Sequence, residues 1–535
     1  MAAEPKADER VRTAELIAAL CLATDLGMGF PFEHGLHTTV IAMRLADRLG
    51  VDRRTASETY YACLLSHAGC TTDAHVAAQV FGGSLTTSFN PLMYGSGREV
   101  LTGLIRALPD PGGPALVRVA QTARRLPRMA RETTTHISAA CEVAGMLADR
   151  VGAPPSVPGI LAHLTERWDG KGPLRRATRE QIPLPMRIVH VATDAALQRV
   201  LGGPEHAAQV IRGRAGHAFD PKVAACLLGE ASEVLALDES ASAWEEVLAF
   251  EPPPLLMLTE EALDRALAAM GNFADLISPY LAGHSTGVAT LADTAARACN
   301  IDPAGARVIR RAGLVHDLGR VAVHARIWRK PGPLSADDWE QVRLHPYHTE
   351  RVLSRSSFLS ALSPIAATHH ERLDGSGYHR GATAPGLAFP ARLLAAADVY
   401  HAMTEPRPHR EPLLPERAAQ AMAEEASARR LDSDAVAAVL EAAGQRAPRL
   451  ARPAGLTERE AEVVALLARG LQTKQVAQAL GISVKTADRH IQNAYRKTGV
   501  SSRAAAAMFA MEHGLVAWGE SPSTRSPLDE GLVSG

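Results

Sequence analysis

Imidazole and carboxylate side chains accumulate in order along the second half of the chain. Neutral imidazole and ionised carboxylate are ligands that suit Fe, Mn, Zn or Ni. Neighbouring ligands on a helix point about 100° apart, so the adjacent pair His316-Asp317 can face two metal ions and bridge them. One such histidine is more often a surface or satisfied core residue, but the joint pattern favours ligation. The seven candidate metal ligands are His284, His316, Asp317, His345, His369, His370 and Asp398.

At these residues the sequence resembles the HD-GYP group of HD-domain phosphohydrolases, over about 263–443. The matching strings are SPYLAGHS (278–285), HDLGR (316–320), KPGPLS (330–335), LHP (344–346), HHERLDGSGYH (369–379) and AADVYHAMTEPRPHR (396–410). The resemblance implies an all-helical domain with two or three metal ions that hydrolyses cyclic di-GMP. It also implies that the seven residues are the ligands, with Asp317 bridging.

The same resemblance implies candidates for contact with the substrate. Two cations would lower the pKa of bound water and bind the non-bridging phosphate oxygens. Arg372, Arg407 and Arg410 offer planar donor forks for phosphate or guanine, and Tyr378 joins them as a substrate-binding candidate. The alternative for each arginine is a solvated surface position.

Four positions depart from the family pattern. Arg320 replaces the lysine of HDxGK, so Asp317 and Arg320 are the catalytic candidates, although an arginine cannot readily give up a proton. His379 replaces the proline of GYP, and His401 replaces the second aspartate of ADVxDAL. Tyr280 stands where members with a third metal carry glutamate. We therefore expect two divalent transition-metal ions at most, Fe or Mn, and slow turnover or an altered substrate choice.

The segment 456–515 looks like a LuxR-type helix-turn-helix along its whole length. Thr457 with Glu460 forms a capping box, Gly481 permits a tight turn, and Ser483 caps a recognition helix. A local basic face results, for which the alternative is an ordinary solvated helix. The final helix, 502–513, is expected to support dimerisation on a two-half-site operator. The DNA-binding candidates are Lys485, Arg489, Gln492 and Arg496.

These motifs must be positioned mainly by helices. Apolar residues recur at helical spacing, and alternating strand patterns are scarce, which predicts an all-α fold. At 535 residues the chain has room for about three domains. We expect a degenerate HD-like domain at 1–250, an HD-GYP-like metal-binding domain at 255–447, a LuxR-type domain at 453–518 and a disordered tail at 519–535.

An internal repeat connects the first two domains. With an offset of 250 residues His34 falls on His284, and Asp52 falls on Asp302. Further on, ERWDGKG (166–172) recurs as ERLDGSG (371–377). The first copy lacks the chemistry, because Ser66-His67 replaces the His-Asp pair and Leu164-Thr165 the paired histidines. Packing, dimerisation or ligand sensing are its expected roles.

Composition limits the remaining possibilities. With 57 basic and 58 acidic residues the net charge is −1, so DNA contact must be local to one segment. The six cysteines form no C-x-x-C pair, and no stretch approaches 18 uninterrupted apolar residues. We therefore expect a cytoplasmic protein with no membrane span.

The leading functional hypothesis is a homodimeric transcription regulator whose metal-binding domain senses or hydrolyses a cyclic dinucleotide or another phosphate ester. One alternative is a metal-dependent cyclic di-GMP phosphodiesterase in which the helix-turn-helix only localises or assembles the enzyme. A second alternative is a catalytically silent dimerisation scaffold.

Overall fold

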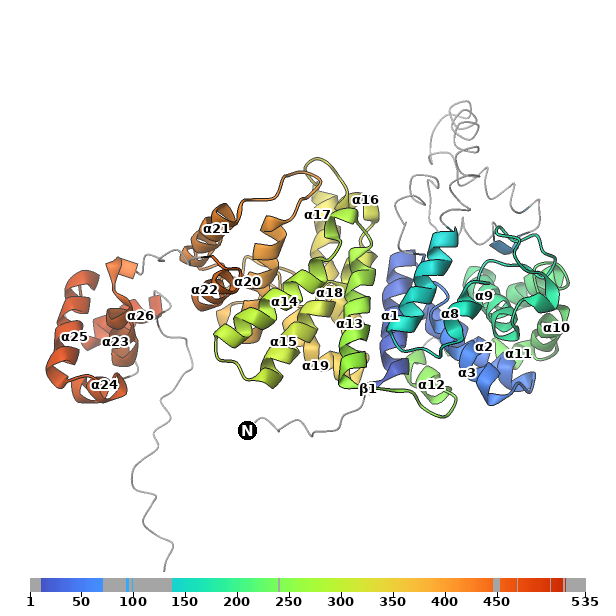
Figure 1. The fold of residues 1–535 in the computed structure, drawn as a ribbon, viewed down its shortest axis with the longest axis horizontal. Coiled ribbons are helices and arrows are strands. Elements are labelled where there is room, and N and C mark those ends of the chain that lie inside the picture. The colour runs from blue at the N-terminus through green and yellow to red at the C-terminus, as the bar shows by residue number, and fades with distance from the viewer. Residues whose placement is uncertain are drawn as a thin grey trace, which may run out of the picture.

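The computed structural model describes residues 11–70, 93–95, 99, 137–238, 241–445, 453–468, 470–500, 502–512 and 515. In this part of the chain, helices dominate, and the one strand pair joins β1 (Val11–Arg12) to β2 (Met257–Leu258) in antiparallel register. The predicted all-α fold is confirmed (Figure 1). The tail predicted at 519–535 lies outside the described residues.

Two helical units and a third small group of helices follow one another along the chain (Figure 1). The first unit contains α1 (Thr13–Met28), α2 (His34–Arg48), α3 (Arg53–Leu64), α8 (Val157–Leu161), α9 (Leu184–Arg214), α10 (Pro221–Gly229), α11 (Ala231–Val234) and α12 (Ala243–Ala249). The second contains α13 (Glu260–Asp275), α14 (His284–Ala298), α15 (Pro303–Val315), the 3₁₀ helix η3 (Leu318–Ala322), α16 (Ala325–Trp328), α17 (Ala336–Arg343), α18 (His345–Leu353), α19 (Ser357–Ala366), α20 (Phe389–Thr404), α21 (Pro415–Ser427) and α22 (Ser433–Ala442).

The two units repeat the same local structure, as the 250-residue offset predicts. The Asp25 carboxylate accepts hydrogen bonds from the Gly35 backbone N–H, and the Asp275 carboxylate accepts one from the Ser285 backbone N–H. In both copies a buried aspartate thus ties the end of one helix to the start of the next. The offset also relates the N-caps of α3 and α15, which are Asp52 and Asp302.

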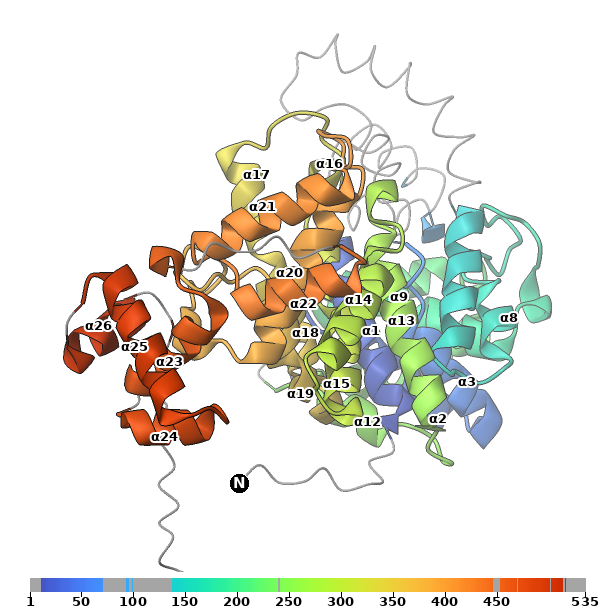
Figure 2. The same cartoon turned by 60° about the vertical axis from the view of Figure 1, so that its left-hand side comes forward.

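The first helix joins the two units into one core. Helix α1 is apolar on nearly all sides and most of its residues are buried, which is typical of a helix surrounded by protein. It packs against α2 and α3 of its own unit and against η3 and α18 of the second unit (Figures 1 and 2). The first unit therefore supports the elements that carry the predicted His316-Asp317 and His345 ligands.

The proline-rich segment between the first two units, 251–256 (EPPPLL), is anchored to the first unit. The buried Glu251 carboxylate accepts hydrogen bonds from Arg12 Nη2 at 2.6 Å and from the Tyr61 hydroxyl at 2.6 Å. The segment that connects the two units is thus held to the first unit by side-chain hydrogen bonds and is not a free linker.

The C-terminal group folds around its own small core. It contains α23 (Glu458–Ala468), α24 (Thr473–Ala479), α25 (Val484–Thr498) and α26 (Arg503–Glu512). Val463, Val476 and Ile491 bring α23, α24 and α25 together in this core. Both views show the four helices as a group of their own (Figures 1 and 2). Within the described residues, no helix has the length and apolarity to traverse a bilayer.

Candidate metal centre and helix-turn-helix

All seven residues predicted as metal ligands lie in two adjacent clusters of the second unit. They come from the start of α14, the junction of α15 with η3, the start of α18, the turn after α19 and the middle of α20. One cluster is His284, His316, Asp317 and Asp398, and the other is His345, His369 and His370.

Close backbone packing holds η3 against α18. Gly319 in η3 approaches α18 so closely that a Cβ atom there would overlap the His345 carbonyl oxygen and the Thr349 nitrogen. The Gly319 N–H donates to the buried Thr349 Oγ1 at 2.9 Å, and that hydroxyl donates to the His316 carbonyl oxygen at 3.0 Å. The sequence HDLG is therefore needed both for its ligands and for the glycine that lets two ligand-bearing elements meet.

Asp317 lies between the two clusters and is fully buried. Its Oδ1 atom is 3.2 Å from His345 Nε2 and 3.3 Å from His369 Nε2. Its Oδ2 atom is 2.9 Å from His316 Nε2 and 3.4 Å from His284 Nε2. One oxygen thus faces each cluster, which is the arrangement that a bridging carboxylate requires.

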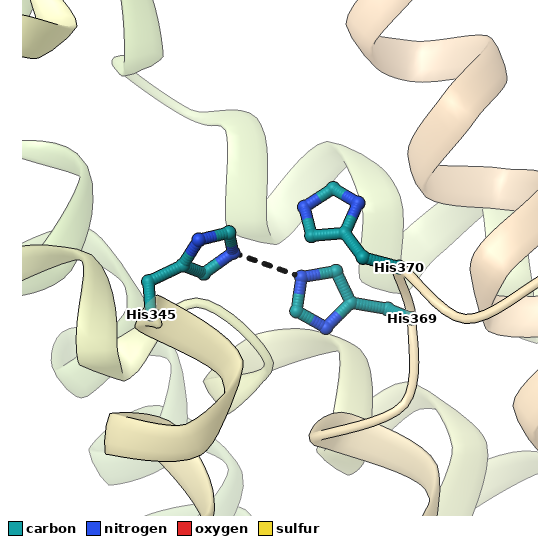
Figure 3. A group of neighbouring side chains, drawn as sticks. All are labelled: His345, His369 and His370. Carbon is teal, nitrogen blue, oxygen red and sulfur yellow. Dashed lines mark hydrogen bonds between the residues drawn. The ribbon is translucent and has the colours of Figure 1, made fainter. Parts of the chain in front are cut away.

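The second cluster consists of three imidazoles that converge from two segments (Figure 3). His345 begins α18, and its Nε2 lies 3.3 Å from His369 Nε2. His370 follows directly, with its ring centroid 4.9 Å from that of His345. Burial is the main cause that lowers the pKa of His345 to about 4, so its imidazole is neutral and able to ligate a cation.

The donor set of the first cluster fits a divalent transition-metal ion. His316 Nε2 and both carboxylate oxygens of Asp317 are buried atoms without an aligned hydrogen-bond partner. Buried polar atoms normally have partners, and a cation is one explanation for such exceptions. Burial opposes ionisation of Asp317, but the charges of Arg320 and His316 hold its pKa well below its usual value. The carboxylate is thus in the ionisation state that a metal requires, and a protonated imidazole would release its proton to solvent when a metal binds.

Arg320 reaches into the same site. Its side chain is nearly buried, and Nη1 lies 2.6 Å from Asp317 Oδ2. The guanidinium stacks over the Trp328 ring at 5.4 Å, and the Trp328 Nε1–H donates to the Arg320 carbonyl oxygen. A permanent positive charge therefore stands beside the central carboxylate. Its catalytic role stays a prediction.

The four predicted substrate-binding residues differ in what they contact. The Tyr378 ring lies 4.7 Å from the His370 ring, at the edge of the second cluster. Arg407 Nη2 pairs with Glu405 at 2.9 Å. The guanidinium groups of Arg372 and Arg410 donate to main-chain carbonyl oxygens, which indicates a structural use for both. Substrate contact remains a prediction for all four residues.

One functional candidate, Glu405, was not predicted from the sequence, and no role was predicted for its neighbour His401. Glu405 Oε2 is 2.9 Å from His284 Nδ1, and Glu405 Oε1 is 3.1 Å from His401 Nδ1. Burial raises the pKa of Glu405, but hydrogen bonds from both imidazoles outweigh it and bring the pKa to about 2. Asp398 and His401 lie three residues apart in α20, but the helix ends at Thr404, so Glu405 reaches His284 from just beyond it and helical spacing gave no signal for this contact.

In the first unit, residues at or next to the positions that correspond to ligands of the second unit are used for packing and for an ion pair. His34, the counterpart of His284, stacks on Phe30 with 4.4 Å between ring centroids, and burial lowers its pKa to about 3. Asp194 is buried and pairs with Arg214 at 2.6 Å. Within the described residues, three groups of side chains could hold a metal ion: the two clusters above and a third made of His284, His401 and Glu405. All three lie in the second unit. The loss of chemistry in the first copy stays a prediction.

The C-terminal helices have the capping expected from the sequence. Glu460 Oε2 accepts from the Thr457 N–H at 2.8 Å, and Thr457 Oγ1 accepts from the Glu460 N–H at 3.3 Å. Gly481 has a φ of 62°, which a glycine adopts without strain, and Ser483 Oγ accepts from the Thr486 N–H to begin α25. The four predicted DNA-binding residues are exposed along one face of α25; they are Lys485, Arg489, Gln492 and Arg496.

Comparison with known proteins gives separate matches to the metal-binding unit and to the C-terminal group of helices. Residues 257–435 match the HD domain family, and residues 454–510 match the luxR family of bacterial regulatory proteins. The 3'3'-cGAMP-specific phosphodiesterase 3 of Vibrio cholerae is 29% identical over 401 residues, 74% of this chain and 87% of the relative. The 3'3'-cGAMP-specific phosphodiesterase 1 of the same species is 33% identical over 32% of this chain and 40% of the relative.

A solved structure extends the match across both helical units. The crystal structure of a cyclic GMP-AMP-specific phosphodiesterase of Vibrio cholerae aligns with a TM-score of 0.57 and 26% identity, over 81% of this chain and 98% of that chain. The matched length exceeds the HD segment and takes in most of the first unit as well. The chain therefore joins an HD domain, similar to those of HD-GYP cyclic-dinucleotide phosphodiesterases, to a C-terminal helix-turn-helix domain of the luxR family.

Proposed function

We propose that this protein is a DNA-binding transcription regulator whose HD domain binds and hydrolyses a cyclic dinucleotide. The observation that carries the proposal is the presence in one chain of a buried, seven-residue histidine and aspartate centre and an exposed polar stripe on α25. The substrate class rests on the relatives, whose names give 3'3'-cGAMP as substrate.

The seven ligand candidates would hold two divalent ions, Fe or Mn, with Asp317 between them. Bound there, such ions supply positive charge to the non-bridging oxygens of a phosphodiester and lower the pKa of water. Arg320 holds the Asp317 carboxylate in place and adds a fixed positive charge. Because an arginine keeps its proton, the leaving oxygen must take its proton from another donor, which favours slow turnover.

The polypeptide also offers surfaces for the nucleobases and phosphates. The Tyr378 ring, at the edge of the imidazole cluster, presents a flat face on which a base can stack. Arg407 is close enough to the centre for the charge of Arg320 to help burial lower its pKa. A phosphate bound nearby would compete with Glu405 for the Arg407 guanidinium.

The exposed polar stripe on α25 is the surface that we propose contacts DNA. Its members are spaced so that they share one exposed face of a helix of 15 residues, opposite the buried Ala487 and Ile491. Arginine and lysine donate to guanine and to phosphates, and glutamine can pair with adenine in the major groove. Dimerisation through the last helix, α26, would place the α25 helices of two chains on successive half-sites of the DNA.

Two other functions remain as alternatives to the regulator. In the first, the chain is a phosphodiesterase that uses the helix-turn-helix only for localisation or assembly; in the second, it is a silent scaffold. Selection of bound sequences from random duplex DNA by the full-length protein separates the regulator from both, because each alternative predicts no preferred sequence.

Arg489→Ala should weaken binding to the selected site by about 1–3 kcal/mol, the loss expected for one base-contacting arginine. The control is Arg417→Ala, which removes an exposed arginine from α21 and should bind as the wild type does. Titration of a fluorescent duplex measures both affinities. A wild-type protein that selects no sequence would contradict the regulator.

A further inference from the structure

Three of the buried histidines in the centre are oriented in the same way. The Nδ1 atoms of His316, His345 and His369 lie 2.7, 2.6 and 2.6 Å from the carbonyl oxygens three residues earlier in the chain. A carbonyl oxygen can only accept, so each Nδ1 carries a proton, and in the neutral imidazole the lone pair that can bind a cation is then on Nε2. In these three cases the main chain itself fixes the tautomer.

His284 is oriented by a side chain instead. It begins α14 directly after Gly283, which has a φ of 83°, and its Nδ1 faces the Glu405 carboxylate at 2.9 Å. Its Nε2 faces Asp398 Oδ1 at 3.1 Å, inside the first cluster. Glu405 therefore occupies the place that a main-chain carbonyl occupies for the other three histidines.

Glu405 is itself held on two further sides. His401 Nδ1 lies 3.1 Å from Oε1, and Arg407 Nη2 lies 2.9 Å from Oε2. The His401 ring fills the space beside Gly287 of α14, where a Cβ atom would overlap it. The carboxylate at the end of α20 is thus fixed against the start of α14, and the two helices pack closely.

We propose that Glu405 is a positioning residue that orients His284 so that its Nε2 meets a metal ion together with Asp398, and that His401 clamps the Glu405 carboxylate. The inference rests on the proposed metal centre. It assigns a role to Glu405 and to His401, which stands at the position of the second ADVxDAL aspartate. Carboxylate partners of metal-bound histidines raise ligand basicity and fix ring orientation.

The test compares full-length Glu405→Ala and Glu405→Gln with the wild type. Each protein is loaded with Mn(II), exposed to a chelator and analysed for bound manganese over time. Glu405→Ala should release one of its two ions about 10–100-fold faster, the usual effect of removing such a partner, while the other ion leaves at the wild-type rate. Glu405→Gln keeps an acceptor oxygen and should show a smaller effect. Glu411→Gln, an exposed carboxylate in the following loop, is the matched control.

Three results would overturn the inference. Wild-type release rates in both Glu405 variants would show that His284 needs no partner. Equal acceleration at both positions, with a lower melting temperature of the metal-free protein, would show a merely structural role. A third ion in the wild type, lost alone in Glu405→Ala, would make His284, His401 and Glu405 a separate cation site.

A further variant separates failure of the inference from failure of the metal centre. If His316→Ala/Asp317→Ala loses manganese while the Glu405 variants match the wild type, only the role of Glu405 is wrong. If the wild type binds no manganese, or if the double variant keeps all of it, the centre itself is wrong and the inference falls with it.

Discussion

At the scale of single residues, the centre depends on one carboxylate that faces two groups of imidazoles. Among the residues described, Asp317 pairs with Arg320 and with His284, His316, His345 and His369. The accumulation of these residue types, together with the resemblance to HD-GYP domains, was the basis for predicting that the seven residues meet. Glu405 was not predicted, because it follows the end of α20 and only the packing of α20 on α14 brings it to His284.

Replacement of His316 and Asp317 together by alanine should remove at least one metal ion per chain. The change deletes two donors of the first cluster and the only carboxylate that faces both clusters among the residues described. Elemental analysis of protein purified under identical conditions measures the result. His217→Ala, which removes an exposed histidine of the first unit, should keep the wild-type metal content. Unchanged metal in the double variant would refute the ligand assignment.

At the scale of elements, the close approach of η3 to α18 decides whether the ligand-bearing segments can meet. The helix periods, the cap at Ser483 and the capping box at Thr457 followed from the sequence, because each depends on residues near one another in the chain. The contact of η3 with α18 did not, because it joins segments 30 residues apart through backbone atoms at a glycine.

Gly319→Ala should destabilise the second unit and impair metal binding. The added Cβ would overlap backbone atoms of α18, which cannot move aside as a flexible side chain can, so the element carrying His345 must shift. Overpacking of this kind typically costs about 1–3 kcal/mol. Denaturant unfolding of the metal-free protein measures the loss. Gly332→Ala is the control, because its Cβ would meet nothing within 4 Å; equal stability of the two variants would contradict the packing argument.

Acid should loosen the C-terminal domain through Glu460. This nearly buried carboxylate pairs with Lys497 Nζ at 2.6 Å and accepts from the Thr457 N–H. Burial raises its pKa, but these partners outweigh burial and lower the pKa below its usual value of 4.5. The stabilisation is therefore complete above about pH 4.5 and is lost as the pH falls through the lowered pKa.

Hydrogen exchange in α23 and α25 measures this effect. Glu460→Gln should reduce protection at neutral pH by the equivalent of about 1–2 kcal/mol, and the difference from the wild type should shrink in acid. Glu462→Gln alters an exposed ion pair with Arg459 and should have little effect. A difference that stays constant from pH 7 to pH 3 would rule out the ionised Glu460 as its cause.

At the scale of the whole molecule, the first unit contacts helix α18, which carries one of the candidate metal ligands. Phe32, just before α2, lies 3.8 Å beneath the Arg351 guanidinium of α18, and Glu33 pairs with Arg355 at 2.8 Å. Helix α18 also carries His345, so a change in the first unit would reach the centre through one short helix. The repeat itself was predicted from ERxDGxG and the 250-residue offset, but the shared core was not, because sequence periodicity does not show which buried faces meet.

Hydrolysis of cyclic dinucleotides by the full-length protein tests the central claim most directly. The purified protein, reconstituted with Fe(II) or Mn(II), is incubated with 3'3'-cGAMP and, separately, with cyclic di-GMP, and His316→Ala/Asp317→Ala serves as the blank. The account predicts linear dinucleotide or mononucleotide product that requires metal and is absent from the blank. No product from a wild-type protein shown to contain its metal would contradict hydrolysis of these substrates by the HD domain.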